Sequence, residues 1–282
     1  MTEVRVWGAD AGDFLEGRLI WSALNALKPA KAEPPAVVDL SGLQLVRPYA
    51  LAAIGALGCL AGGKARLVMP ATQLARDHLV RSGLGDFFVL EEGTALPHSR
   101  RTVPIRQLVR PDASFTDEIT RAWDGEFGGM SPGIRPRLAD HLDEMIRNAL
   151  AHAASPVGCI VAAQVFPAVP SVEVAILDLG QTVRGHLTKQ DAYRGLTTDA
   201  AAIEMATREG VSGTAPGALN VLGEPNSGIG LYELREYCEA GGGEMTIVSG
   251  TELMVFRLES PPVVRPFAGG FPGCLVNIRF RV

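Results

Sequence analysis

The sequence is poor in cysteine, and it lacks a long apolar run. Its four cysteines (Cys59, Cys159, Cys238 and Cys274) lie far apart and form no CxxC pair. This spacing argues against a metal site, and the N-terminus carries no secretory signal, so we expect reduced thiols in a cytoplasmic protein. The most apolar run, residues 50–61, is shorter than the roughly 20 residues that a membrane span needs. We interpret it as a core helix and expect no membrane partner.

An excess of basic residues is also absent. The 282 residues include 26 Lys and Arg against 31 Asp and Glu, which gives a formal net charge of −5. This balance argues against nucleic acid as the main partner, because nucleic-acid binding needs a basic footprint. Apolar residues make up 47% of the chain, which is enough for a packed core, and the length fits one large domain or two ordinary ones.

The first third of the chain alternates β-branched runs with helical patterns. The expected strands are residues 4–7, 37–40, 66–69 and 87–90, and the expected helices are 19–27, 50–61 and 72–81. This alternation predicts a small α/β domain over residues 1–95. Residues 91–102 lose periodicity and carry turn formers, so we place the domain boundary there and expect a linker and a first strand over 96–112.

The second part, residues 113–282, predicts an α+β domain with a mixed sheet and helices on one face. The expected helices are 115–123, 137–153 and 230–239, and the expected strands are 158–165, 171–177 and others towards the end. A long polar, glycine-rich segment covers 180–227 and is too long for a plain connector.

The helix expected at 137–153 carries an acid and an amide one turn apart. Apolar residues at helical spacing form one stripe, and Glu144 and Asn148 lie on another as i, i+4 neighbours. An Asn carbonyl can bind Mg²⁺ without adding charge near phosphates, and a nearby carboxylate can orient or deprotonate an attacking water or hydroxyl. The alternative is a solvated Glu–Asn pair on a helix surface.

The strand expected at 171–177 runs into Asp178-Leu179-Gly180. An Asp at a strand end can accept a hydrogen bond from the exocyclic amine of adenine, and Gly180 lets the backbone approach a base closely. The alternative is an ordinary turn in which Asp precedes Gly.

A glycine turn, residues 226–231 (NSGIGL), leads into the helix expected at 230–239. Glycines followed by a helix N-terminus favour phosphate, because free N–H groups and the positive end of the helix dipole meet there. The segment follows a loop and lacks a third glycine, so it is no Rossmann fingerprint, and no Walker A motif occurs. The alternative is an ordinary helix entry that contains glycine.

The order of these motifs resembles that of the GHKL ATPase superfamily (gyrase, Hsp90, histidine kinase, MutL) over about residues 103–282. Residues 144–149 resemble its N box, 178–180 its G1 box and 228–231 its G2 box, and residues 271–274 resemble its closing Gly-Thr strand. Thr182 stands where a second G1 glycine is usual, and Cys274 replaces the usual Thr. The resemblance implies a Bergerat-type α/β sandwich.

The resemblance also implies ATP and Mg²⁺ as cofactors and a role for each matched residue. Asn148 would bind Mg²⁺, Glu144 would act on the attacking group, and Asp178 would hold adenine. The backbone would approach the base and phosphates at three glycines, Gly180, Gly228 and Gly230. Cys274 would complete the site from the last strand. Residues 181–227 would form an ATP lid with a helix at 198–208.

The first third more loosely resembles the STAS domain of anti-sigma-factor antagonists, through residues 37–43, 50–61, 67–69 and 79–88. The family's phosphorylated Ser or Thr lies just before the helix, but the stretch here, 46–50 (VRPYA), has neither. We therefore expect a docking module and no phosphorylation of this domain.

Together these resemblances imply an ATP·Mg²⁺-binding regulator in bacterial-type signalling, an ATPase or a protein kinase that acts on a regulatory protein partner. A homodimer is left open. No helical hairpin with a phosphoacceptor His precedes the ATPase-like part, which disfavours a histidine autokinase. One alternative is a non-catalytic interaction protein with ATP as a conformational ligand. A metabolic enzyme is disfavoured, because no Gly-x-Ser-x-Gly elbow occurs.

Overall fold

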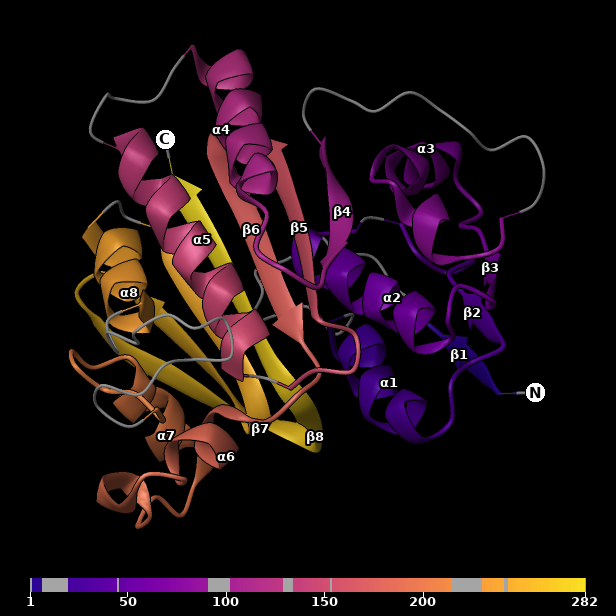
Figure 1. Ribbon diagram of the computed structural model, residues 1–282. Coiled ribbons are helices and arrows are strands. Elements are labelled where there is room, and N and C mark those ends of the chain that lie inside the picture. The colour runs from indigo at the N-terminus through magenta and orange to yellow at the C-terminus, as the bar shows by residue number, and fades with distance from the viewer. Residues whose placement is uncertain are drawn as a thin grey trace.

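A computed structural model describes residues 2–6, 20–44, 46–90, 102–128, 134–152, 154–214, 230–240 and 243–281. These residues form two sheets: a three-stranded one in the first third and a five-stranded one in the rest. Figure 1 shows the larger sheet between two sets of helices. Among the described residues, no helix combines the length and apolarity needed to cross a membrane.

The N-terminal unit has a parallel sheet in the order β1-β2-β3, as the alternating pattern predicts. Its elements are β1 (Glu3–Arg5), α1 (Ile20–Ala32), β2 (Val37–Asp39), α2 (Pro48–Leu60), β3 (Arg66–Val68), α3 (Gln73–Arg81) and the 3-10 helix η1 (Leu84–Phe87). The boundary expected at 91–102 lies almost entirely outside the described residues, and β4 begins at Thr102.

The strand predicted at 87–90 is wrong in most of its length. Phe87 ends η1, and the only pairing there is an isolated parallel bridge between Val89 and Arg66. Gly83 adopts a left-handed φ of 78° and starts the 3-10 turn. Phe87 and Phe88 are therefore buried by packing against the neighbouring helix α2, and not by strand pairing.

The five-stranded sheet has the order β4-β5-β6-β8-β7. Its strands are β4 (Thr102–Leu108), β5 (Cys159–Phe166), β6 (Ser171–Asp178), β7 (Glu244–Arg257) and β8 (Ser260–Arg281). Every pairing is antiparallel, so the mixed sheet predicted from the sequence is wrong. The connections between β5 and β6 and between β7 and β8 are short. The chain therefore reverses direction at each of them, and the two strands that it joins pair as antiparallel neighbours.

The two faces of this sheet are covered by different parts of the chain. One face packs against α4 (Ala113–Phe127), α5 (Ile134–His152) and α8 (Gly230–Ala240), as predicted for the helices of this part. The other face packs against α1 and α2 of the N-terminal unit, which share one core with β5, β6 and β8. Helix α2 thus lies between the two sheets, which explains why it is apolar on all sides.

The segment 180–214 is not an irregular connector. It contains α6 (Val183–Leu187), the 3-10 turn η2 (Asp191–Tyr193) and α7 (Asp199–Ala206). The helix predicted at 198–208 is confirmed as α7. These short helices have a small apolar cluster of their own that includes Leu187, Ala202 and Ala206.

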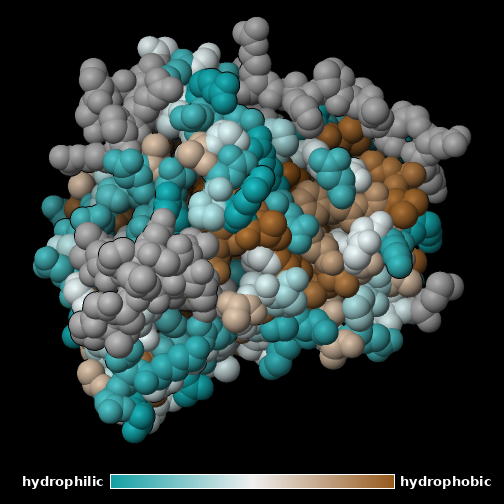
Figure 2. Space-filling model, viewed as in Figure 1, coloured by the Kyte–Doolittle hydropathy of each residue, from teal (hydrophilic) through white to brown (hydrophobic). Residues whose placement is uncertain are grey.

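The outer surface differs between the two units. In Figure 2, hydrophilic residues cover α4 and α5, whereas apolar surface gathers over the N-terminal unit on the right of the view. Large exposed apolar side chains of that unit include Leu74 on α3 and Val89 beside β3.

Candidate functional site

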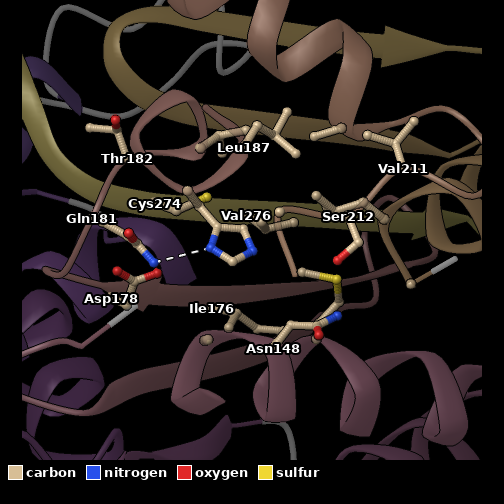
Figure 3. Close-up of a pocket in the computed structure, with 18 residues that line it drawn as sticks. Asn148, Ile176, Asp178, Gln181, Thr182, Leu187, Val211, Ser212, Cys274 and Val276 are labelled. Carbon is tan, nitrogen blue, oxygen red and sulfur yellow. Dashed lines mark hydrogen bonds between the residues drawn. The ribbon is translucent and has the colours of Figure 1, made fainter. Parts of the chain in front are cut away.

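A cavity lies where α5, β6, β8, the start of α8 and the segment 180–214 meet. Its cavity volume is about 130 Å³, which is smaller than the roughly 300–1,000 Å³ of typical small-molecule sites. Four predicted site residues from four separate elements line it, namely Asn148, Asp178, Gly230 and Cys274. Glu144 and Gly180 are not among the lining residues, and Gly228 lies outside the described residues. Figure 3 shows Asn148, Asp178 and Cys274 around the same space.

Helix α5 presents the acid and the amide to one end of the cavity. The amide Nδ2 of Asn148 lies 3.3 Å from Oε1 of Glu144 and donates a hydrogen bond to it. Leu142, Met145 and Ile146 are buried on the neighbouring stripe, so packing fixes the helix that carries the pair. The hydrogen bond occupies the amide nitrogen and leaves Oδ1 of Asn148, a hard oxygen ligand, for a cation.

Gly230 starts α8 directly against this pair. A Cβ at residue 230 would lie 2.8 Å from Nδ2 of Asn148 and 2.9 Å from Cγ of Glu144. Only glycine fits there without displacing one of these side chains. Gly230 and the next residue, Leu231, line the cavity, so the free N–H groups of the first helical turn are at its wall.

Asp178 is the buried acid of the cavity, at the end of β6. Its side chain is 5% exposed, and its Oδ1 accepts a hydrogen bond from the N–H of Gly180 at 2.8 Å. The backbone N–H of Cys274, its partner on β8, also donates to the carboxyl group. Burial raises the pKa of Asp178 to about 7, because desolvation outweighs these two hydrogen bonds and the positive charge of Lys31.

Two thiols lie near this carboxyl group. Burial raises the pKa of Cys159 and of Cys274, and the charge of Asp178 raises both further. Both thiols are therefore neutral at physiological pH, and neither is an activated nucleophile.

The glycine beside Cys274 is required by close packing. A Cβ at Gly273 would lie 2.2 Å from the carbonyl oxygen of Asp178. Oγ of Ser249 donates a hydrogen bond to the carbonyl oxygen of Gly273 at 2.7 Å and accepts one from the N–H of Val183 at 2.9 Å. Ser249 therefore joins β7, β8 and the start of α6 beside Asp178.

The wall opposite α5 comes from the segment 180–214. Gln181 Nε2 and His186 Nδ1 are 3.1 Å apart and hydrogen-bonded, and Figure 3 shows the side chain of Gln181 beside that of Asp178. Thr182, which replaces a glycine of the expected motif, is the N-cap of α6, and its Oγ1 accepts the N–H of Gly185 at 3.1 Å. Helix capping therefore explains why a threonine stands at position 182.

Hydrogen bonds fix α7 on the sheet, and an ion pair joins it to α6. Oδ2 of Asp199 accepts hydrogen bonds from the N–H of Thr251 at 2.9 Å and from its Oγ1 at 3.1 Å. Nε of Arg184 lies 3.0 Å from Oδ1 of the same Asp. The segment 180–214 is therefore fastened to β7 on the side of α7.

Several lining residues were not predicted from the sequence, including Gln181, His186 and Ser212. The family resemblance implied that residues 181–227 form a lid over the site, but no pattern in the sequence tells which side chains of this segment face the cavity. Among the described residues, no group of three or more His, Cys, Asp or Glu could hold a metal ion. A divalent cation at Asn148 would need oxygen ligands from a bound molecule.

A scan of known protein families and a search of curated proteins both find no match to this chain.

Proposed function

We propose that this chain is a GHKL-type regulator that binds ATP·Mg²⁺ in the cavity between α5 and the segment 180–214. One observation carries the proposal: Asn148, Asp178, Gly230 and Cys274 are far apart in the sequence and line one cavity. A Bergerat-type arrangement requires an amide, a buried acid and a helix N-terminus around one nucleotide, and these residues supply all three.

The adenine end is assigned to Asp178. An ionised carboxylate at the end of β6 accepts the exocyclic amine, and a base with an oxygen at that position would leave two acceptors facing each other. Ile176, Met145 and Val276 supply apolar surface for the base in the same cavity. The hydrogen bonds from Gly180 and Cys274 hold the carboxylate in place.

The phosphate end is assigned to the start of α8 beside Asn148. N–H groups of the first turn of an 11-residue helix attract an anion, and Gly230 allows its close approach. Oδ1 of Asn148 would ligate Mg²⁺, which commonly takes one or two protein oxygens and completes its shell with phosphates and water. When bound, the ion would neutralise phosphate charge.

Glu144 is assigned to the attacking water or hydroxyl, in hydrolysis or in transfer to a partner protein. It lies one turn from Asn148 and is hydrogen-bonded to it. The apolar surface over the N-terminal unit supports that unit as the place where a regulatory protein docks.

A second candidate function is a non-catalytic interaction protein with ATP as a conformational ligand. One observation favours it: Glu144 is not among the residues that line the cavity, whereas Asn148 is.

Binding is tested by calorimetry with a non-hydrolysable ATP analogue and Mg²⁺ at pH 8. We expect micromolar-range affinity for the unaltered chain and a loss of at least about tenfold for Asp178→Asn, since one charge-assisted hydrogen bond is worth about that factor. Asp191→Asn is the matched control, because Asp191 lies on η2 and its side chain is 85% exposed. Equal affinity of all three proteins would refute the adenine assignment.

Catalysis is tested with Glu144→Gln, which keeps the shape of the side chain and its hydrogen bond to Asn148. Unchanged analogue binding with loss of ATP hydrolysis or transfer supports the catalytic role. Unchanged turnover would refute it. Nucleotide binding with no turnover in the unaltered chain, with and without a partner, would favour the conformational-ligand function.

A further inference from the structure

We propose that Lys31, on α1 of the N-terminal unit, is a positioning residue that holds Asp178 ready for the adenine amine. This inference rests on the proposed function and adds to it a residue from outside the ATP-binding part of the chain. Lys31 touches neither the reacting atoms nor the cavity lining, and it acts through the turn that follows Asp178.

The ammonium group of Lys31 joins the two backbone segments on either side of Asp178. Its Nζ donates to the carbonyl oxygen of Leu179 at 2.6 Å, immediately after Asp178, and lies 3.4 Å from the carbonyl oxygen of Pro272 on β8. Pro272 precedes Gly273, whose Cα packs against the Asp178 carbonyl. One side chain thus fixes β8 relative to the turn that carries the acid.

The same turn is held from its other side. The N–H of Leu179 donates to Oγ of Ser155 at 3.1 Å. Both polar groups of the Leu179 backbone are therefore bonded to side chains, Ser155 from the loop before β5 and Lys31 from the N-terminal unit. Loss of Lys31 leaves the carbonyl oxygen of Leu179 without this side-chain donor, and only the N–H side of the Leu179 backbone stays bonded to a side chain.

The positive charge of Lys31 also helps Asp178 to accept a hydrogen bond, in addition to the effect of its contacts with the turn. Burial raises the pKa of Asp178, and the positive charge of Lys31 opposes that rise. The other titratable groups near the acid are the neutral thiols of Cys159 on β5 and Cys274 on β8. His186, from the segment 180–214, lines the same cavity. Lys31 therefore favours the ionised carboxylate, the form that accepts from an amine.

Helix α1 reaches this position because it is packed on the sheet. Leu24 and Leu27 on its buried side belong to the core shared with β6 and β8. The position of Lys31 thus depends on how the N-terminal unit sits on the sheet. Any partner that moves α1 would weaken nucleotide binding, and by linkage nucleotide would oppose that movement.

The test is calorimetry with an ATP analogue and Mg²⁺ between pH 5.5 and 8.5 on the full chain. Lys31→Met removes the charge and the hydrogen bonds, and Lys31→Arg keeps a cationic donor. Lys28→Met is the matched control, because Lys28 lies one turn earlier on α1 and its Nζ donates to the carbonyl oxygen of Gly269 at 2.6 Å, away from Asp178. Thermal unfolding of each variant checks that it is folded.

We expect Lys31→Met to bind the analogue about tenfold more weakly at pH 7, on the scale of one charge-assisted hydrogen bond, and Lys28→Met to bind within twofold of the unaltered chain. The pH midpoint of binding should rise in Lys31→Met and stay in place in Lys31→Arg. The same pH series is repeated with both Lys31 variants in a His186→Gln background. Histidine ordinarily titrates near 6.5, so this background excludes His186 as the cause of the pH midpoint of binding.

Two results would overturn the inference: affinity of Lys31→Met within twofold of the unaltered chain, or equal movement of the pH midpoint in Lys31→Met and Lys31→Arg. These are distinct from failure of the proposed function. In that case the unaltered chain itself binds no analogue, or Asp178→Asn binds as well as the unaltered chain.

Discussion

The two faces of the five-stranded sheet are built from the same strands but differ in what they pack against: one borders the candidate site, and the other belongs to a continuous apolar core. On β6, Ile176 and Asp178 face α5 and the cavity, whereas Ala175 and Leu177 face α1 and α2 in a continuous apolar core. The helices α5 and α8 leave a gap that the segment 180–214 covers, and a cavity forms there. The N-terminal unit borders a cavity of its own, of about 500 Å³, where the end of α2 and η1 meet β4.

The comparison teaches that the N-terminal unit supports the five-stranded sheet, because it covers one whole side of the apolar core. A buried ion pair makes this explicit: Arg47, at the start of α2, donates to Oε2 of Glu173 on β6 through Nε at 3.0 Å and through a second nitrogen. Both side chains are about nine-tenths buried or more. Such a pair fixes how two units sit on each other, because a mismatched placement leaves a charge buried alone.

The largest expected effect comes from breaking this pair. Arg47→Ala removes the main partner of the buried Glu173, leaving it only Arg279 and Asn277, and should lower the free energy of unfolding by about 3–5 kcal/mol. Denaturant unfolding measures the change. Arg208→Ala is the control, because its pair with Glu204 is exposed, and it should change stability by less than about 1 kcal/mol. A loss under about 1 kcal/mol in Arg47→Ala would mean that the two units are only loosely joined.

The second expected effect is a pH dependence of stability caused by Asp178, on the cavity face of the sheet. The pKa of Asp178 is raised from 3.8 to about 7 in the folded chain, so its protonated form is favoured by folding. That contribution is fully present below pH 3.8 and is lost as the pH rises through 7.

Between pH 5 and pH 8 the unaltered chain should therefore lose roughly 3 kcal/mol relative to Asp178→Asn, since about two pH units at 1.36 kcal/mol each are involved. Unfolding of both proteins at the two pH values checks this difference. Parallel pH profiles would show that Asp178 is ionised in the folded chain well below pH 7.

The third effect compares alanine substitutions at two glycines, both in helices that pack on the cavity face of the sheet. Gly230→Ala places a Cβ against Glu144 and Asn148 and should weaken analogue binding by about tenfold, the cost of misplacing one good polar contact. Gly125→Ala in α4 meets nothing within 4 Å and should stabilise the chain by about 0.4–1 kcal/mol with unchanged binding. Equal binding by both variants would remove the start of α8 from the site.

The smallest effect concerns the fastening of α7. Thr251→Ala removes one of the two hydrogen bonds that Asp199 accepts from this residue and should cost about 1 kcal/mol, seen as faster hydrogen exchange in α7. Thr188→Ala is the control, because its Oγ1 bonds only locally, to the carbonyl oxygen of Arg184 at 2.8 Å. The control should leave exchange in α7 unchanged, and equal exchange in both variants would argue against this anchor.

Much of the fold could be predicted from local patterns. The stripe around Leu142 fixed the place of α5, and the β-branched run before Asp178 fixed β6, because helical and strand periods are properties of short windows. The spacing of Glu144 and Asn148 likewise predicted their hydrogen-bonded neighbourhood. The common cavity of Asn148, Asp178 and Gly230 was expected from motif order and is found in the structure.

Other features could not be predicted because they depend on contacts between distant segments. Lys31 is an ordinary lysine near a helix end, and only the packing of α1 on β8 brings it to Leu179. The strand expected at 87–90 failed because burial against α2 replaced strand pairing there. The packing of α1 and α2 on the five-stranded sheet was also invisible, since an apolar helix does not specify what covers it.

The position of β8 has a consequence for how the chain folds as it is made. This strand is the last in sequence, yet it lies inside the sheet, between β6 and β7. Until residues 260–281 emerge from the ribosome, β6 has an open edge, and the apolar sides of α1 and α2 lack part of their cover. Folding of the N-terminal unit therefore finishes only after β8 has been made, so the nascent chain passes through a stage in which chaperones have exposed apolar surface to bind.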